Sequence, residues 1–547
     1  MVEVSNRTGF PFWISLVAAI GLLNIALAFA NVWPTLGITW KGDLSAELAV
    51  ALLAVVWLHG RTHQPPSPRV MRRLTWGWVF LAVGHYVDAT ARSLYGRDVN
   101  LYWDLKLMPN VSAMFVSVAN VALVAAVVVA VVLVPWLLAF PVRWAVRCVA
   151  AATVVPAARG VMTAVGAGVL LLGAPQVLGW PIPHAPRVLR PVSFAYATEA
   201  AEVVYEASGI GRKPLPPAPL MDANLARVEG ADVLLIFLEA YGVVAWDKPE
   251  LVRELAATRT DLARDIRETG RGVVSATVES TTFGGESWLA HISLMSGTAV
   301  RNPDMNARLM RERGRDTLVK AFGRRGFRTV AAMPGLQMNW PEGAFYGFQQ
   351  IYGTKELNYQ GPPFSWWDLT DQFTLARLDE LELANPERRP VFAFFPTISS
   401  HAPFTPAPPY QPDWAKVLTP TPYDQSALDA AYAVPPDWTN LTPSYAEALN
   451  YDHKVLGGYL RHRADRDMVI VLIGDHQPAA FVSGEGAPWD VPVHVIASRP
   501  AVLEGLKARG FRDGLSPSRP ATTTMDGLLQ TLLGAFSAPS AGAAGQR

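Results

Sequence analysis

The sequence is poor in cysteine and in charged residues. Cys148 is the only cysteine, so no disulfide within the chain stabilises a domain, and stability must come from a buried hydrophobic core. Charged residues make up 17% of the chain, against roughly 25% in an average soluble protein. This deficit indicates that part of the chain lies in lipid.

Features of nucleic-acid-binding proteins are also missing. The net charge is +1, and the chain has no long basic run and no array of alternating basic and aromatic residues. These absences argue against a nucleic-acid partner. No internal repeat is found.

Long apolar stretches are concentrated in residues 1–180. About five of them approach the roughly 20 residues that a helix needs to cross a bilayer. They lie near 11–32, 44–60, 74–91, 111–140 and 149–179. A cleaved signal peptide is the alternative for the first, because Ala28-Phe29-Ala30 resembles a cleavage site, although Arg7 is its only positive flank.

The arginines predict the orientation of these spans, since short loops rich in Lys and Arg stay on the cytoplasmic side. The loop expected after the second span contains Arg61, Arg69, Arg72 and Arg73, and the loop expected after the fourth contains Arg143 and Arg147. Both loops are therefore predicted to be cytoplasmic. With an odd number of spans, everything after about residue 180 is then extracytoplasmic.

Four segments are therefore expected. Residues 1–180 form the transmembrane domain, and 181–228 form a linker in which a helix around 193–209 lies along the membrane surface. Residues 229–535 form an extracytoplasmic domain, large enough to fold on its own core. Residues 536–547 form a disordered tail.

Short apolar runs alternate with helical patterns in residues 229–535. The run ADVLLIFLEA at 231–240 is almost continuously apolar, as expected for a strand buried on both faces. Further strands are predicted at 271–279, 327–333, 389–397, 467–475 and 491–498, and helices at 250–269, 315–325, 373–384 and 444–464. This order predicts an α/β/α domain with a mostly parallel sheet, whose ligands bind at the carboxyl ends of the strands.

Polar residues follow three of these strands. Glu239 ends the first, Asp475 and His476 end the strand at 467–475, and Ser287 lies in the turn and helix start after 271–279. Individually, a carboxylate there is often a solvated cap, Asp-His a turn, and a serine a helix N-cap. Together they are ligands that a hard or borderline divalent ion accepts.

The motifs that carry these residues are LLIFLEAYG, FGGESWLAHISLMSG and LIGDHQP. With them the sequence resembles the alkaline phosphatase and sulfatase superfamily, in particular its membrane-anchored branch that contains lipoteichoic acid synthases. SSHAPF at 399–404 is similar to the histidine-containing substrate segment of that family. The resemblance implies a bacterial inner-membrane protein whose sulfatase-like domain faces the periplasm or outside. It also implies one divalent ion, Mn²⁺ ahead of Mg²⁺ or Zn²⁺.

The resemblance implies that Ser287 is the nucleophile, because the family places this residue ten positions before a glycine, here Gly297. Ser280, Thr281 and Thr282 are the rival hydroxyls. Sulfatases need a Pro two residues and an Arg four residues after the nucleophile for conversion to formylglycine, and this sequence has neither. An unmodified serine, suited to attack on phosphorus, is therefore expected.

The resemblance also implies the other roles. Glu239, Ser287, Asp475 and His476 would hold the metal, and His401 would contact the phosphoryl group or shuttle its proton. Trp340 matches a family tryptophan beside the substrate head group, with packing as the alternative. Pro341 and Glu342 follow it where the family has an arginine, which leaves the head group open. His291, His453 and His494 are interpreted as packing residues.

The function implied is transfer of phosphoglycerol, or of phosphoethanolamine, from a phospholipid donor to an envelope glycan or lipid acceptor. A phosphodiesterase or phosphatase with the same chemistry is one alternative. A non-catalytic, sulfatase-like lipid sensor is the other, and the presence of all four site residues argues against it.

Overall fold

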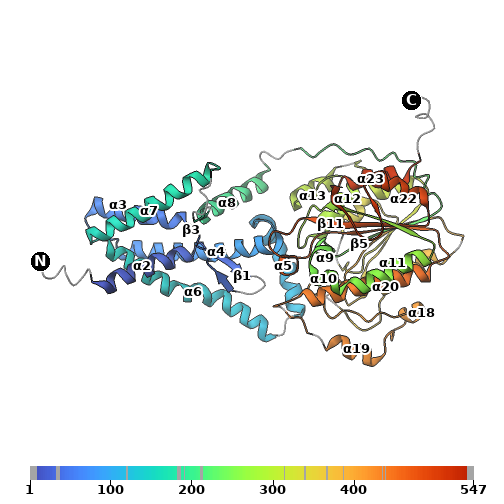
Figure 1. The fold of residues 1–547 in the computed structure, drawn as a ribbon, viewed down its shortest axis with the longest axis horizontal. Coiled ribbons are helices and arrows are strands. Elements are labelled where there is room, and N and C mark those ends of the chain that lie inside the picture. The colour runs from blue at the N-terminus through green and yellow to red at the C-terminus, as the bar shows by residue number, and fades with distance from the viewer. Residues whose placement is uncertain are drawn as a thin grey trace. The chain divides into compact units, whose positions relative to one another are not determined.

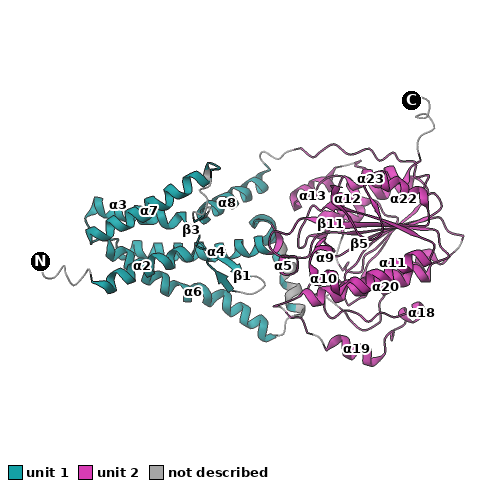
Figure 2. Cartoon of the chain, in the orientation of Figure 1, with its two compact units in different colours: residues 1–93, 97–212 teal, residues 94–96, 213–547 magenta. Residues whose placement is uncertain are grey.

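The computed structural model describes most of the chain. It covers residues 9–32, 37–118, 121–180, 186–189, 191–209, 214–312, 314–337, 340–364, 368–385, 387–433, 435–437 and 439–538. The chain forms two compact units (Figure 2): residues 1–93 with 97–212, and residues 94–96 with 213–547.

The N-terminal unit is helical. Its helices are α2 (Phe10–Ile25), α3 (Ala46–Thr62), α4 (Pro68–Tyr95), α5 (Leu101–Val118), α6 (Val121–Ala152), α7 (Pro156–Val177) and α8 (Val192–Ser208). Two short strand pairs accompany them: β1 (Ala30–Val32) with β2 (Gly37–Thr39), and β3 (Leu44–Ser45) with β4 (Val188–Leu189). Helices α2, α3, α4, α6 and α7 bury one shared hydrophobic core.

Two described helices are long and apolar enough to cross a membrane, judged by length and composition: Val121–Ala152 and Pro156–Gln176. Helix α2 is apolar but has 16 residues. The predicted placement of the arginines in loops was wrong. Arg143 and Arg147 lie inside α6, Arg61 lies inside α3, and Arg69, Arg72 and Arg73 lie inside α4. Helix α6 continues through Pro135 and Pro141, residues that weaken a helix without always ending it.

The C-terminal unit is built on a nine-stranded sheet with the order β12-β6-β11-β10-β5-β9-β7-β8, in which β13 also pairs with β6. The strands are β5 (Asp232–Leu238), β6 (Gly272–Glu279), β7 (Arg328–Ala332), β8 (Gln350–Tyr352), β9 (Val391–Pro396), β10 (Met468–Gly474), β11 (Asp490–Ala497), β12 (Arg512–Asp513) and β13 (Ser518–Thr524).

The sheet is mixed and mostly parallel. Strands β10, β5, β9, β7 and β8 pair in parallel along one side. Strand β11 runs antiparallel to both of its neighbours, β10 and β6. Because β11 is antiparallel to both β10 and β6, the strands β6, β10 and β5 run in the same direction. Their carboxyl ends therefore lie at the same edge of the sheet.

Helices cover both faces of this sheet. The α-helices of this unit are α9 (Val244–Asp247), α10 (Pro249–Glu254), α11 (Ala256–Glu268), α12 (Ser287–Ser296), α13 (Pro303–Arg311), α14 (Leu318–Arg324), α15 (Pro341–Tyr346), α16 (Thr354–Leu357), α17 (Asp371–Leu378), α18 (Trp414–Val417), α19 (Gln425–Tyr432), α20 (Thr442–His462), α21 (Ala480–Ser483), α22 (Pro500–Lys507) and α23 (Leu528–Phe536). Figure 1 shows α11 and α20 along one face and α12, α22 and α23 along the other.

The side chains of β5 explain the two layers. Val233, Leu235 and Phe237 belong to the core on the α12 and α23 side, whereas Leu234, Ile236 and Leu238 belong to the core on the α11 and α20 side. Successive side chains of a strand point to opposite faces. A continuously apolar strand therefore requires helices on both sides, as the sequence predicts.

Candidate metal and nucleophile site

Neighbouring strands bring the two carboxylates of the site together. In the parallel pair β5 and β10, Leu238 is opposite Gly474, so the residues that follow, Glu239 and Asp475, leave the sheet side by side. Gly474 is required here, because an added Cβ would lie 1.9 Å from the carbonyl oxygen of Tyr241. The pairing register thus places Glu239 and Asp475 at one edge.

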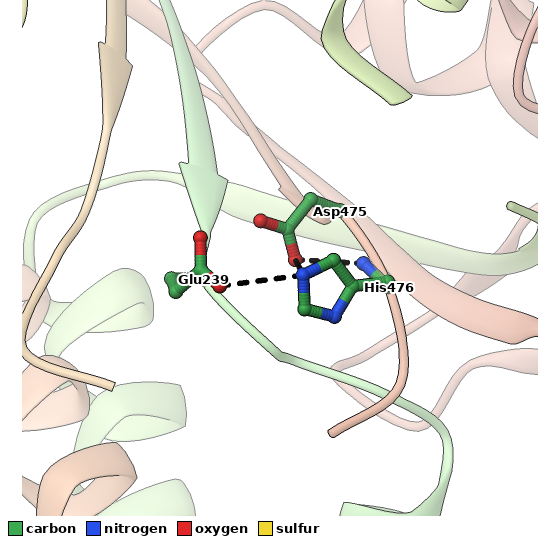
Figure 3. Close-up of side chains that lie close together, drawn as sticks. All are labelled: Glu239, Asp475 and His476. Atoms are coloured by element: carbon green, nitrogen blue, oxygen red, sulfur yellow. Dashed lines mark hydrogen bonds and ion pairs between the residues drawn. The ribbon is translucent and has the colours of Figure 1, made fainter. Parts of the chain in front are cut away.

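His476 lies against both carboxylates (Figure 3). Its Nε2 is 3.3 Å from Oε1 of Glu239 and 3.8 Å from Oδ1 of Asp475. Its Nδ1 is 2.8 Å from the carbonyl oxygen of Gln477. A ring held by its Nδ1 side presents Nε2 to the carboxylates, as a metal-binding histidine does. All three side chains are buried.

Ser287 completes the cluster. It is the first residue of α12, and the preceding Glu286 has a φ of 59°, in the left-handed region. Its Oγ donates a hydrogen bond of 2.8 Å to Oε2 of Glu239 and lies 3.2 Å from Nε2 of His476. The structure therefore brings together Glu239, Ser287, Asp475 and His476, the four residues predicted at the strand ends.

The rival hydroxyls are hydrogen-bonded to backbone carbonyl groups. Ser280 donates to the carbonyl oxygen of Asp475. Thr281 donates to that of Leu289 and Thr282 to that of Gly285. These bonds fix the turn between β6 and α12, whereas the Ser287 hydroxyl faces the acidic cluster.

Burial and mutual contact shift the pKa values in the cluster. Burial raises the pKa of Asp475 well above its usual range, and the neighbouring Glu239 carboxylate raises it further. Burial opposes the ionised form of Glu239, but the hydrogen bond and positive charge of His476 lower the pKa of that carboxyl below its usual range. The two carboxylates in turn outweigh burial and raise the pKa of His476 to about 9. The cluster thus favours added positive charge.

The residues present fit a divalent ion. Glu239, Asp475 and His476 each offer a ligand atom within 4.8 Å of the others. Oδ2 of Asp475 is buried and has no hydrogen-bond partner among the described residues, although buried polar atoms are almost always satisfied. Two carboxylates, an imidazole and a hydroxyl are a donor set for Mn²⁺, Mg²⁺ or Zn²⁺.

His401 and Trp340 lie on other elements. His401 follows β9, its Nδ1 is 2.8 Å from the carbonyl oxygen of Ala402, and its charge contributes to lowering the pKa of Glu239. The Trp340 ring stacks with those of Phe348 and Phe394, at centroid distances of 6.1 and 6.2 Å. Their roles as substrate contacts stay predictions.

The histidines interpreted as packing residues have partners inside the domain. The ring of His291 is 4.4 Å from that of Phe237, and Nδ1 of His453 is 3.1 Å from Oγ1 of Thr258. His494 lies between Ser275 Oγ, at 2.6 Å, and the Tyr241 hydroxyl, at 3.1 Å. Burial lowers the pKa of each imidazole to about 3.

Sequence reasoning missed two residues that support the segment after β9, Thr397 and Asp371. Thr397 Oγ1 accepts the backbone N–H of Glu239 at 3.1 Å. Asp371 accepts the N–H groups of Ile398 and Ser399 at 2.8 and 2.7 Å, and so fixes the segment that leads to His401. The polar run TISS at 397–400, directly after an apolar strand, was the available signal.

Comparison with known proteins identifies the domain. Residues 294–495 match the model of the Sulfatase family, a segment that contains Asp475 and His476 and begins after Ser287. The C-terminal unit therefore contains a segment that matches the Sulfatase family, in agreement with the sulfatase resemblance of the sequence. A sequence search of curated proteins gives no match.

Several solved structures are similar to the chain, at low identity. The lipooligosaccharide phosphoethanolamine transferase A (EptA) of Neisseria meningitidis is 13% identical over 96% of this chain and 94% of its own, with a TM-score of 0.45. The lipoteichoic acid synthase LtaP of Listeria monocytogenes is 13% identical over 62% of this chain and 80% of its own, with a TM-score of 0.35. The phosphoglycerol transferase GacH of Streptococcus pyogenes is 13% identical over 63% of this chain and 81% of its own, with a TM-score of 0.34.

Proposed function

We propose that the protein is a metal-dependent phosphotransferase of the bacterial inner membrane. It moves a phosphoglycerol, or a phosphoethanolamine, head group from a phospholipid to an envelope glycan or lipid. The observation that carries the proposal is the Ser287 hydroxyl, which lies 2.8 Å from Glu239 and 3.2 Å from His476 inside the acidic cluster.

The residues that would hold the ion are Glu239, Asp475 and His476, with Ser287 as the fourth ligand. Mn²⁺ is the expected ion, with Mg²⁺ or Zn²⁺ as alternatives. When bound, the ion supplies positive charge that lowers the pKa of the serine hydroxyl and neutralises the phosphoryl oxygens.

The first half of the reaction is attack of Ser287 Oγ on phosphorus. The Oγ–P bond forms while the bond from phosphorus to the diacylglycerol oxygen breaks. Glu239 accepts the hydrogen bond of this hydroxyl and orients its oxygen, and the proton is released to water as the Oγ–P bond forms. The diacylglycerol oxygen leaves with a proton that His401 supplies.

The second half reverses these roles. A hydroxyl of the acceptor attacks phosphorus, the Oγ–P bond breaks, and Ser287 regains a proton. His401 takes the proton of the attacking hydroxyl. Water in place of the acceptor would give hydrolysis, so the outcome depends on which molecule reaches the phospho-serine.

The apolar helices α6 and α7 support a membrane location, since a domain tethered to a bilayer meets lipid head groups directly. We include in the proposal about five spans in residues 1–180, a linker over 181–228 and an outward-facing domain over 229–535, with phosphoglycerol slightly ahead of phosphoethanolamine as the group transferred.

Mass spectrometry tests the proposal. The purified full-length protein is incubated with Mn²⁺ and phosphatidylglycerol or phosphatidylethanolamine, and the peptide containing Ser287 is analysed. An adduct with the mass of the donor's head group is expected, and it should be absent from the Ser287→Ala variant. Neither an adduct nor a released head group in folded, metal-loaded protein would overturn the proposal and favour a lipid sensor.

A further inference from the structure

A basic cavity lies within the N-terminal unit. It has a volume of about 380 Å³ and lies between the first turns of α4 and the C-terminal part of α6. Four arginines line it: Arg69, Arg72, Arg143 and Arg147. No acidic residue is among its lining residues. Four arginines in one cavity, without an acidic residue to neutralise them, indicate an anionic ligand.

The spacing of these residues shows how the two helices build the cavity. On α6, Trp136, Phe140 and Arg143 follow one another at steps of four and three, the spacing that keeps side chains on one face of a helix. On α4, Arg69 and Arg72 lie within the first turns. The cavity is therefore made by one face of each helix.

The cavity has a basic end and an aromatic end. Trp136 and Arg143 are seven residues apart on α6, which corresponds to about 10 Å along a helix axis. Trp76 and Phe140 extend the aromatic wall, although Trp136 and Phe140 remain 60% and 59% exposed. A ligand that fills the whole cavity therefore needs a charged group and an apolar part.

The four arginines are available for such a ligand. Among the described residues, none of their side chains forms a hydrogen bond or an ion pair. By contrast, Arg159 in the same unit donates to the carbonyl oxygen of Thr153 at 2.8 Å. Guanidinium groups bind phosphate oxygens through two parallel N–H donors, so this set matches a phosphate.

We propose that this cavity binds the head-group phosphate of an anionic glycerophospholipid. The arginines contact the phosphate, and the aromatic wall packs against the glycerol and the start of the acyl chains. A lipid is favoured as the ligand over a soluble phosphate ester. The reason is that the part of α6 before Trp136 is an exposed apolar run that includes Val128 and Val131. That run provides a surface for the acyl chains.

This site is separate from the cluster around Ser287 and does not depend on turnover. It rests only on the part of the proposed function that embeds the N-terminal unit in a membrane. Resistance of the full-length protein to alkaline carbonate extraction tests that embedding independently. A failed lipid-binding experiment can thus be distinguished from a failed membrane assignment.

Native mass spectrometry measures the binding. Full-length Ser287→Ala protein in detergent is titrated with phosphatidylglycerol and, separately, with phosphatidylcholine. Tighter binding of phosphatidylglycerol is expected. Arg72→Gln and Arg143→Gln should each weaken it about fivefold, since one basic side chain near a lipid head group contributes about 1 kcal/mol. The Arg72→Gln, Arg143→Gln double variant should lose the preference for the anionic lipid.

Arg73→Gln is the matched control, because Arg73 is next to Arg72 on the same helix and is exposed like it, but does not line the cavity. It should bind phosphatidylglycerol like the parent protein. Equal binding of the two lipids by the parent, or equal losses in Arg72→Gln and Arg73→Gln, would overturn the proposal. Displacement of the lipid by millimolar inorganic phosphate alone would also overturn it, in favour of a soluble phosphate ester.

Discussion

The hydroxyl of Ser287 donates a 2.8 Å hydrogen bond to the carboxylate of Glu239, a residue 48 positions earlier in the chain. The same oxygen lies 3.2 Å from Nε2 of His476, 189 positions later. A serine at a helix start ordinarily caps the helix with its own oxygen. Here the side chain instead points at a carboxylate and an imidazole, a geometry suited to a nucleophile.

Replacement of the proposed nucleophile should separate activity from stability. Ser287→Ala is expected to lower head-group release or transfer by at least about a thousandfold, because no covalent intermediate can form. The free energy of unfolding should change by only about 1 kcal/mol, the usual contribution of one hydrogen bond. Activity is measured as head group released from phospholipid, and stability by urea unfolding.

Ser296→Ala is the matched control for that variant. Ser296 is the last residue of the same helix, and its buried hydroxyl has no hydrogen-bond partner among the described residues. Its removal should leave activity intact. Normal turnover in Ser287→Ala would instead assign the nucleophile to Thr281 or Thr282.

Metal removal should destabilise the C-terminal unit. An ion that binds only the folded protein stabilises it by about 2.7 kcal/mol at a concentration 100 times Kd. Chelation is therefore expected to lower the melting temperature of the wild-type protein by several degrees. Asp475→Asn, which loses a charged ligand, should melt at nearly the same temperature with and without chelator. A chelator effect of equal size in both proteins would contradict the assignment of Asp475.

Acidification should destabilise the domain partly through His494. Burial lowers the pKa of this imidazole from 6.5 to about 3, so it stays neutral in the folded protein while the unfolded chain takes up a proton. Its contribution to stability is present above pH 6.5 and is lost as the pH falls toward 3, at about 1.4 kcal/mol per pH unit.

The His494→Gln variant tests whether His494 causes stability to fall as the pH is lowered. Urea unfolding of wild type and variant at pH 7.5 and pH 5.5 gives the pH slope of stability, which should be smaller in the variant. The variant is also expected to be less stable at pH 7.5, since His494 contacts Ser275 and Tyr241. Equal slopes would show that another group carries the pH dependence.

The ion pair between Arg388 and Asp232 should contribute strongly to stability. Both guanidinium Nη atoms lie 2.6 Å from the Asp232 carboxylate, which also accepts the N–H of Val391 at 2.9 Å. Arg388→Ala leaves a carboxylate buried without its cation, at an expected cost of about 3 kcal/mol. Arg389→Ala, at the exposed neighbour, should cost about 0.5 kcal/mol or less. Similar unfolding midpoints for both variants would contradict this.

The central strands were predictable because their side chains follow a simple rule. The predicted strand at 231–240 is β5, Asp232–Leu238, and that at 467–475 is β10, Met468–Gly474. Both are buried on two faces, so they form nearly unbroken apolar runs. Short edge strands such as β12, Arg512–Asp513, are exposed and polar, and no apolar pattern marks them.

Strand direction was harder to predict than strand position. The segment at 491–498 has the same apolar character as its parallel neighbours, yet β11 is antiparallel. The connection from β10 to β11 spans residues 475–489 and includes α21, a length that permits either direction, so neither hydrophobicity nor connection length predicts it. The residues at the ends of β5 and β10 were predicted, since each is polar after an apolar run. Thr397 was missed although it has the same position, directly after the apolar strand β9.

The place of β11 in the sheet also sets the time at which the site can first exist during synthesis. Strand β6, which leads to Ser287, reaches the β5 and β10 pair only through β11, Asp490–Ala497. A nascent chain that ends before residue 490 holds the serine but has no strand to bridge it to Glu239. The site is therefore completed only after about nine-tenths of the protein has been made, so shorter nascent chains lack an assembled site.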